Sequence, residues 1–209
     1  MSLRGKAAIT GIGETLFVKE GEKTIYELAA EAARLALQDA GLVPRDIDGL
    51  ITLGALSTTA RMNNTLASYL GIKPTYSAEA SVYGASGGMA LKLAAEAIAS
   101  GTARNILVIG ADVNFLKHPS NEMCELAEAY QKPFIGAGIN QHYGLVATLY
   151  DHLYGDSSVE RAKIAVMQRY NASFNENSLF GHKPLTVDDV LSAPVICSPL
   201  TLFEIVAPC

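Results

Sequence analysis

The sequence contains no clustered run of basic residues, and its 209 residues carry a formal net charge of -5 at pH 7. A nucleic-acid-binding surface requires a positive footprint, so this charge argues against a nucleic acid partner. No window reaches the roughly 18 to 20 uninterrupted apolar residues of a membrane span. The first residues, MSLRGKAAITG, also lack the hydrophobic core of a signal peptide. We therefore expect a soluble cytoplasmic protein without a membrane partner. The composition is compatible with small acidic or polar ligands.

Metal-ligating residues are few and widely spaced. The odd number of cysteines gives neither a disulfide framework nor a CxxC pair, and these cysteines are Cys124, Cys197 and Cys209. The histidines are equally scattered, at His118, His142, His152 and His182. Structural zinc sites need closely spaced ligand pairs, so we expect no metal site.

Apolar runs of strand length alternate with helical patterns in the first half of the chain. The runs that predict strands are Lys6–Gly13, Gly49–Gly54, Thr75–Val82 and Asn105–Gly110. Helical patterns fill the intervals at residues 24–40, 60–70 and 85–100, and apolar residues surround so much of the last one that we expect it to be buried. This alternation predicts an α/β fold with a mostly parallel sheet covered by helices on both faces.

The first helix has the clearest boundaries. Thr24 and Glu27 have the spacing of a capping box, and Gly41 follows where a left-handed C-terminal cap is wanted.

The rhythm of strands and helices ends after Asp112. Residues 114–144 show no clean period and predict loops and short helices, and helical patterns return at 145–153 and 158–172. Residues 186–191 read as a short capped turn and residues 193–200 as an extended segment. We predict a domain at 1–112, a second at 113–204, and at 205–209 the start of a return to the sheet. Because the chain stops just after an apolar run, we expect the protein to continue beyond Cys209.

A glycine-rich turn between the third strand and the following helix carries the strongest chemical signal. Small residues at 84–88 permit a sharp bend, and the free amides and positive dipole end of a helix favour an anion at such a place. A nucleophile usually occupies this kind of elbow, yet its apex is Gly84, which has no side chain.

The order of these blocks resembles the thiolase superfamily, in particular the sterol-carrier-protein-type thiolases and the lipid-transfer-protein aldolases. The residues that carry the resemblance are KAAITGIGETLF, TIYELAAEAARLALQDAGLVPRDIDGLI, YGASGGMAL with AAEAIASG, NILVIGAD, RYNASFN and KPLTVDDVLSAPVICSPLTLFE. The resemblance implies the N-terminal βαβαβαβ half of a thiolase-like fold with an inserted loop domain, and the C-terminal half has no counterpart in this sequence.

The resemblance also implies a chemistry. Gly84 fills the place of the family's nucleophilic cysteine, before Ala85, Ser86 and Gly87. The implied function is an enzyme of lipid metabolism that binds a coenzyme A thioester as substrate, without a tightly bound cofactor. It would form or cleave the adjacent carbon-carbon bond as an aldolase does, without an acyl-enzyme. The alternatives are acetyl-CoA acetyltransferase-type acyl transfer by a different nucleophile, and a non-catalytic acyl-CoA-binding or scaffold subunit.

Individual side chains in the elbow and the loops give further candidates. We expect Gly84, Ala85, Ser86 and Gly87 to contact substrate, although a serine in the first turn of a helix also caps backbone amides. No catalytic group is assigned; the candidates are Ser86, Tyr83, His142 and Cys124. Each has a structural alternative, which is packing for Tyr83 and Cys124 and a solvated loop for His142. Cys209 has a structural role in this interpretation.

Two cations and one strand complete the predictions. Lys183 and Arg169 are candidates for the phosphates of coenzyme A, with solvated surface as the alternative. The resemblance implies a homodimer, which we place at Thr75–Val82. It also implies a possible small partner protein with a zinc ribbon and an OB fold.

Overall fold

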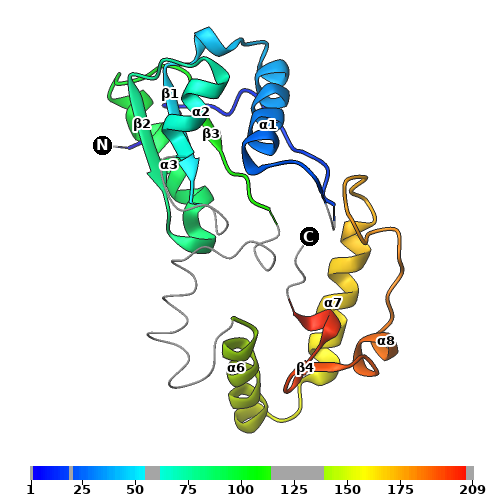
Figure 1. The fold of residues 1–209 in the computed structure, drawn as a ribbon. Coiled ribbons are helices and arrows are strands. Elements are labelled where there is room, and N and C mark those ends of the chain that lie inside the picture. The colour runs from blue at the N-terminus through cyan, green and yellow to red at the C-terminus, as the bar shows by residue number, and fades with distance from the viewer. Residues whose placement is uncertain (1, 19–20, 55–61, 114–138, 206–209) are drawn as a thin grey trace. The chain divides into compact units, whose positions relative to one another are not determined.

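The computed structural model describes residues 2–18, 21–54, 62–113 and 139–205. The chain divides into two compact units, one of residues 1–16 and 20–120 and the other of residues 17–19 and 121–209 (Figure 1). Within the described ranges, no helix is both long enough and apolar enough to cross a membrane. The limits proposed above for the sequence domains and the cytoplasmic location stay predictions.

Helix α1 (Ile25–Ala40) has the boundaries that its sequence predicts. The Glu27 amide donates to Thr24 Oγ1 at 3.3 Å and the Thr24 amide donates to Glu27 Oε2 at 2.7 Å, which completes the capping box. Gly41 ends the helix at φ 67° in the left-handed region. The buried stripe of this helix consists of Ile25, Ala29, Ala33 and Leu37.

Three parallel strands form the sheet of the first unit, in the order β2-β1-β3. They are β1 (Gly49–Leu53), β2 (Tyr76–Ala80) and β3 (Ile106–Ile109). In the register, Gly49 lies opposite Tyr76 on one side and Ile106 on the other. These strands confirm three of the four predicted strand positions.

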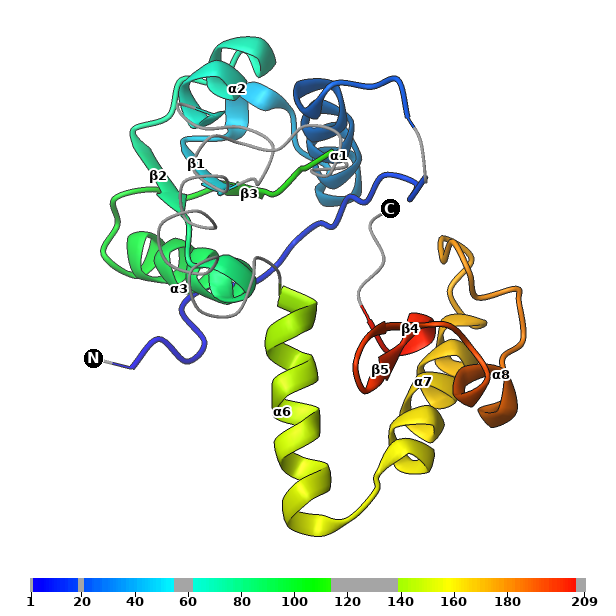
Figure 2. The same ribbon diagram turned by 60° about the horizontal axis from the view of Figure 1, so that its bottom comes forward.

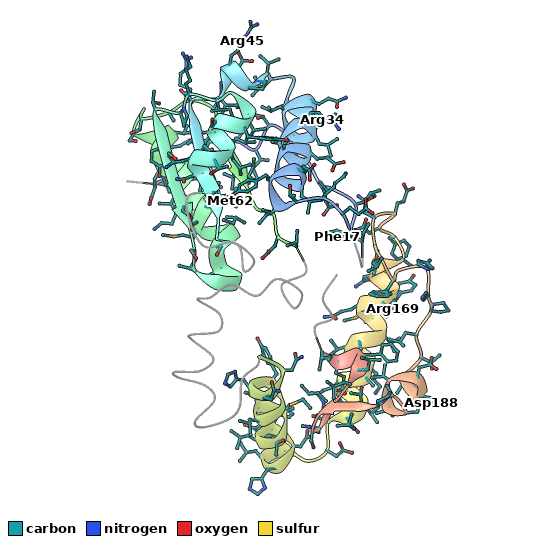
Figure 3. All side chains as sticks on the ribbon, viewed as in Figure 1. Phe17, Arg34, Arg45, Met62, Arg169 and Asp188 are labelled. Atoms are coloured by element: carbon teal, nitrogen blue, oxygen red, sulfur yellow. The ribbon has the colours of Figure 1, made fainter. Side chains whose placement is uncertain are left out.

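Helices cover both faces of this sheet (Figure 2). Leu50 packs in one cluster with residues of α1 and α2 (Met62–Leu70), including Leu37 and Leu66. The next residue, Ile51, faces the other way and packs with Ala90 and Ala94 of α3 (Ser86–Ala99). Successive side chains of a strand point to opposite faces, so the unbroken apolar run of β1 suits burial on both sides. Figure 3 labels Met62, which begins α2 and is 3% exposed.

The prediction of a buried strand at Lys6–Gly13 is wrong. Residues 7–18 form no strand, and Ile9 and Ile12 are 70% and 73% exposed. The segment lies instead against α1: a Cβ atom on Gly11 would meet the carbonyl oxygen of Ala36, and one on Gly13 that of Ala32. A strand needs a hydrogen-bonded neighbour, and none of the described residues offers one to this segment.

Burial around the whole of α3 is also a wrong prediction. Its buried residues are Ser86, Ala90, Ala94 and Ala97, which follow one face, whereas Met89 and Leu91 are 39% and 49% exposed. Only the face that contacts the sheet is covered by described residues.

The second unit is mainly helical, with α6 (Ile139–Tyr154), α7 (Ser158–Ala172) and α8 (Val187–Leu191). A short hairpin of β4 (Val195–Cys197) and β5 (Leu200–Thr201) and the turn η4 (Leu202–Glu204) follow. Thr186 caps the N-terminus of α8 with a second capping box, where the sequence predicts a short capped turn. Residues 114–138, where loops were predicted, lie outside the described residues, and residues 139–144 belong to α6.

A charged network connects the helices of this unit. Arg161 on α7 contacts Asp151 on α6 at 2.9 Å and Glu204 in η4 at 3.0 Å. The Glu204 side chain is only 8% exposed. Gly144 permits a close approach of α6 to β4, because a Cβ there would lie 2.9 Å from Cys197 Sγ.

Candidate active site

The carboxyl ends of the three parallel strands lie at the same end of the sheet, and a glycine follows β1 and another follows β3 there. Gly54 follows β1 in the chain and packs closely against Ser81. A Cβ atom on Gly54 would collide with the Ser81 hydroxyl. Gly110 follows β3, and its Cβ would lie 2.6 Å from Leu53 Cδ1. Ligands of open α/β sheets bind outside the carboxyl ends of the strands. The elbow after β2 therefore lies at the end of the sheet where a ligand is expected.

The elbow is a single turn of 3₁₀ helix, η2 (Tyr83–Ala85), which leads directly into α3. The Ala85 amide donates to the Val82 carbonyl at 3.2 Å. Ser86 is 6% exposed, and its hydroxyl accepts a hydrogen bond from the Val82 amide at 3.0 Å. This serine thus connects the first turn of α3 to the short loop that follows β2.

Gly84 borders open space. Apart from its two neighbours in the chain, no described residue has a heavy atom within 4 Å of the Cβ position of Gly84, and the same holds for Gly87 and Gly88 apart from their neighbours and the backbone of their own helix. All of these glycines are exposed. A side chain at Gly84 would therefore meet no steric obstacle there, so glycine at the apex is not imposed by packing against those residues.

The N-terminus of α3 presents backbone donors beside this space. Ala85 is the N-cap residue, and its side chain supplies no capping hydrogen bond. The first amides of a helix have no partner within the helix, and the helix dipole adds partial positive charge there. This combination suits a developing oxyanion.

A separate pocket of about 380 Å³ lies in the second unit, between α7 and the segment that precedes α8. Its lining residues are Val166, Arg169, Tyr170, Ser173, Gly181, His182, Pro184 and Leu185. Arg169, labelled in Figure 3, donates through Nη1 to the Lys183 carbonyl at 2.9 Å. Its guanidinium carbon lies 5.7 Å from the centre of the Phe180 ring. The pocket thus combines a fixed guanidinium with aromatic and apolar walls.

The candidate residues are distributed over both units. Gly84, Ala85, Ser86 and Gly87 adjoin one another in the first unit, together with the backbone of Tyr83. His142, Arg169 and Lys183 belong to the second unit. Cys124 and Cys209 lie outside the described residues.

His142 differs from its predicted surroundings, and Lys183 lies outside the residues that line the pocket. His142 was expected in a loop but lies in α6, because the helix begins at Ile139. Lys183 does not line the pocket with its side chain; its ammonium lies 6.0 Å from the centre of the Phe180 ring.

The sequence interpretation overlooked Tyr170 and His182 as pocket residues. Tyr170 follows Arg169 in the chain and His182 precedes Lys183, and both cations were candidates for coenzyme A phosphates. The sequence therefore contained a local signal for these two pocket residues. No group of three or more histidine, cysteine or acidic side chains within the described ranges is arranged to hold a metal ion.

The profile of the family described as "Thiolase, N-terminal domain" matches residues 6–183. The chain belongs to this family. In the thiolase family, it is 32% identical to the steroid side-chain-cleaving aldolase of Thermomonospora curvata over 97% of this chain and 54% of that protein. It is 28% identical to the 17-hydroxy-3-oxo-4-pregnene-20-carboxyl-CoA lyase of Mycobacterium tuberculosis over the same shares.

Solved structures agree with this membership. The Ltp2-ChsH2(DUF35) aldolase superposes with a TM-score of 0.79 at 30% sequence identity, over 94% of this chain and 51% of that chain. This likeness confirms the thiolase-like fold that the sequence predicts. The chain spans about half the length of the curated relatives it matches.

Proposed function

We propose that this protein binds a coenzyme A thioester and makes or breaks the carbon-carbon bond beside the thioester without an acyl-enzyme. The observation that carries the proposal is Gly84, an exposed glycine at the apex of the elbow, where the described residues leave open the space that a side chain would take. The names of the similar proteins, an aldolase and a carboxyl-CoA lyase, support the same reaction class.

The chemistry is a retro-aldol step on a β-hydroxyacyl thioester. A base removes the hydroxyl proton, the bond between Cα and Cβ breaks, and its electron pair moves through Cα to the thioester oxygen. The resulting enolate then takes a proton at Cα, so the products are a carbonyl compound and a shortened acyl-CoA. The backbone amides that begin α3 would hold the enolate oxygen. No described residue is assigned as the base.

A substitution at the apex tests the absence of an acyl-enzyme. In the full-length protein, Gly84→Cys introduces a thiol at a helix N-terminus, where its pKa is lowered and its thiolate favoured. Incubation with acetyl-CoA is expected to leave the parent protein unmodified and to acetylate the variant, as measured by intact mass. Gly88→Cys is the matched control, because the described residues leave space for a side chain there as well, but Gly88 lies within the first turn of α3 and not at the apex.

The products and adducts that the parent protein forms distinguish between the candidate reactions. We expect it to release a carbonyl product from a β-hydroxyacyl-CoA. A stable acyl adduct on any residue of the parent would overturn the non-covalent route and favour acyl transfer. Coenzyme A binding without turnover of either thioester would favour the scaffold subunit instead.

The pocket of the second unit is the proposed site for the phosphates of coenzyme A. A guanidinium forms strong charge-assisted hydrogen bonds with phosphate oxygens, and the bond from Arg169 to the Lys183 carbonyl uses only one of its donors. We expect Arg169→Gln to weaken coenzyme A binding about tenfold in calorimetric titration, since one charge-assisted contact is lost.

Lys163→Gln on the same helix is the control for the loss of one charge, because Lys163 is exposed and does not line the pocket. Equal effects of the two substitutions would contradict the assignment of Arg169.

Two assemblies belong to the proposal. The first is a homodimer through the strand segment Thr75–Val82, for which support comes from the position of β2 at an edge of the sheet. Sedimentation that finds only monomer at micromolar concentration would contradict it.

The second assembly is with a small zinc-ribbon and OB-fold protein, by analogy with the two-protein aldolase of similar structure. Co-expression with such a protein, followed by light scattering on a sizing column, tests for a complex.

A further inference from the structure

The elbow between β2 and α3 is packed at its two ends and little in between. Ala80 at the end of β2 and Ala90 in α3 are 3% and 0% exposed, and both belong to the apolar cluster around Ile51. Of the residues between Ala80 and Ala90 whose burial the structure describes, only Ser86 is buried. The elbow therefore depends on a polar side chain, and not on an apolar one, for its attachment to the rest of the unit.

Hydrogen bonds to Val82 close the elbow on itself. The Ala85 amide donates to the Val82 carbonyl at 3.2 Å, a contact between backbone groups that any residue at position 85 except proline can form. The Val82 amide donates to the Ser86 hydroxyl oxygen at 3.0 Å. This second bond exists only because residue 86 carries a hydroxyl group. Val82 itself is 45% exposed, so its own side chain adds little packing.

The same few residues carry the amides that begin α3. The helix starts at Ser86, so its first amides are those of Ser86, Gly87 and Gly88. Donors that stabilise a developing charge are effective when they already point at the place where the charge appears, because no reorientation is then needed during the reaction. The bond from Val82 holds Ser86, the residue that supplies the first of these amides.

We propose that Ser86 is a positioning residue for the carbon-carbon bond chemistry proposed above, on which this inference rests. Its hydroxyl holds the elbow in one arrangement, so that the first amides of α3 are directed at the enolate oxygen before substrate binds. Ser86 acts through the backbone of the elbow and not by contact with the thioester, which agrees with a side chain that is 6% exposed.

Steady-state kinetics of the full-length protein with a β-hydroxyacyl-CoA test this role. We expect Ser86→Ala to lower kcat about tenfold or more and to leave KM within about twofold, because displaced donors weaken the transition state while the remote contacts to coenzyme A remain. Ser86→Thr keeps the hydroxyl and is expected to recover most of kcat. A raised KM with unchanged kcat, or a threonine variant no more active than the alanine variant, would overturn the proposal.

Ser100→Ala at the other end of α3 is the matched control. The Ser100 hydroxyl donates to the Ala97 carbonyl at 3.0 Å, so this substitution also removes a side-chain hydrogen bond to the backbone, but away from the elbow. We expect the two alanine variants to lower the urea midpoint to a similar extent, and only Ser86→Ala to lower kcat. Equal losses of kcat would show that Ser86 contributes to the stability of the helix alone.

Hydrogen exchange without substrate distinguishes positioning from direct contact. If Ser86 orders the elbow, Ser86→Ala should speed exchange of the Val82 amide about tenfold in the ligand-free protein, as the loss of one hydrogen bond implies. Exchange in the second half of α3 should stay unchanged. A variant with lowered kcat but unchanged exchange at Val82 would mean that the hydroxyl contacts substrate, and would refute the positioning role.

The parent protein separates a failure of this inference from a failure of the proposed function. A parent that turns over β-hydroxyacyl-CoA, together with a Ser86→Ala variant of equal kcat, refutes the role of Ser86 and leaves the proposed function intact. A parent without turnover contradicts the proposed function and with it the catalytic part of this inference. The exchange of the Val82 amide then decides whether Ser86 orders the elbow.

Discussion

The two units of this chain are stabilised by different forces. In the first unit, apolar side chains from α1, α2 and α3 pack on both faces of a parallel sheet, and Leu50 and Ile51 at its centre are completely buried. In the second, the buried apolar residues are few among those described, namely Ala162, Val190 and Leu200. Helices α6 and α7 are joined instead through Arg161 and its two carboxylate partners.

This difference extends to the candidate binding regions. The elbow of the first unit presents backbone amides beside glycines on a rigid sheet, which suits the stabilisation of charge that develops during a reaction. The pocket of the second unit presents a guanidinium and ring faces, which suits the holding of a charged ligand. We therefore propose reaction chemistry for the first unit and, separately, the holding of a charged ligand for the second.

The largest expected effect concerns the apolar core of the first unit. Leu50→Ala removes a side chain that is 0% exposed and should lower the free energy of unfolding by about 3 kcal/mol. Leu149→Ala in α6 is the matched control, because Leu149 is 58% exposed, and should change it by less than about 0.5 kcal/mol. Urea unfolding measures both. A similar loss for the two variants would show that α6 is packed as firmly as the core.

A smaller effect is expected from the charged network of the second unit. Arg161→Met leaves the Glu204 carboxylate, which is 8% exposed, with the Thr201 amide but without its ion-pair partner, and should cost about 1 to 2 kcal/mol. Lys163→Met on the same helix removes an exposed charge and should have little effect. If Arg161→Met proves neutral in urea unfolding, the network does not hold the second unit together.

Each unit has a helix with a capping box, so the same Thr→Ala substitution can be made in both units. Thr24→Ala and Thr186→Ala each remove a side chain that accepts a helix N-terminal amide, and each should cost about 1 kcal/mol. The comparison is sharpened by local probes: hydrogen exchange should rise in α1 for the first variant and in α8 for the second. Exchange that rises throughout both units would contradict their separation.

The smallest effect is a dependence of stability on acidic pH. The Ser157 hydroxyl, followed by Arg161, holds the pKa of Asp151 below its ordinary value, and the Thr186 hydroxyl does the same for the pKa of Asp189. A carboxyl whose pKa is lower in the folded state contributes stability above its unfolded pKa, and this contribution is lost as pH falls through the folded value.

Unfolding of the second unit should therefore become easier below about pH 4, where the unfolded carboxyls take up protons. Urea midpoints measured from pH 6 down to pH 3 provide the check. The decline should be shallower in Arg161→Met, and an equal decline in both proteins would disprove the coupling to Arg161.

Local signals predicted much of the fold. The capping box at Thr24, the glycine that ends α1 and the capped turn at 186–191 appear where the sequence places them, because each depends on hydrogen bonds within a few residues. The strands β1, β2 and β3 were also recognised, and the signal was clearest for β1, since a strand buried on both faces has a continuous apolar signature.

Predictions that needed knowledge of distant neighbours were less successful. The run Lys6–Gly13 has the composition of a strand, but no described segment lies where it could pair. The pocket around Arg169 needs residues 181–185 to fold back on α7, and no spacing rule in the sequence reports that contact.

By itself, the sequence determined the identity of the elements, the elbow and the membership in the thiolase family, because local hydrogen bonding and the order of motifs are written along the chain. Only the tertiary structure decided that the described residues leave the space at the Gly84 apex open, that they cover α3 on one face, and that Arg169 lines a pocket. The physical reason is that burial and free volume at a residue depend on which remote segments supply the surrounding atoms.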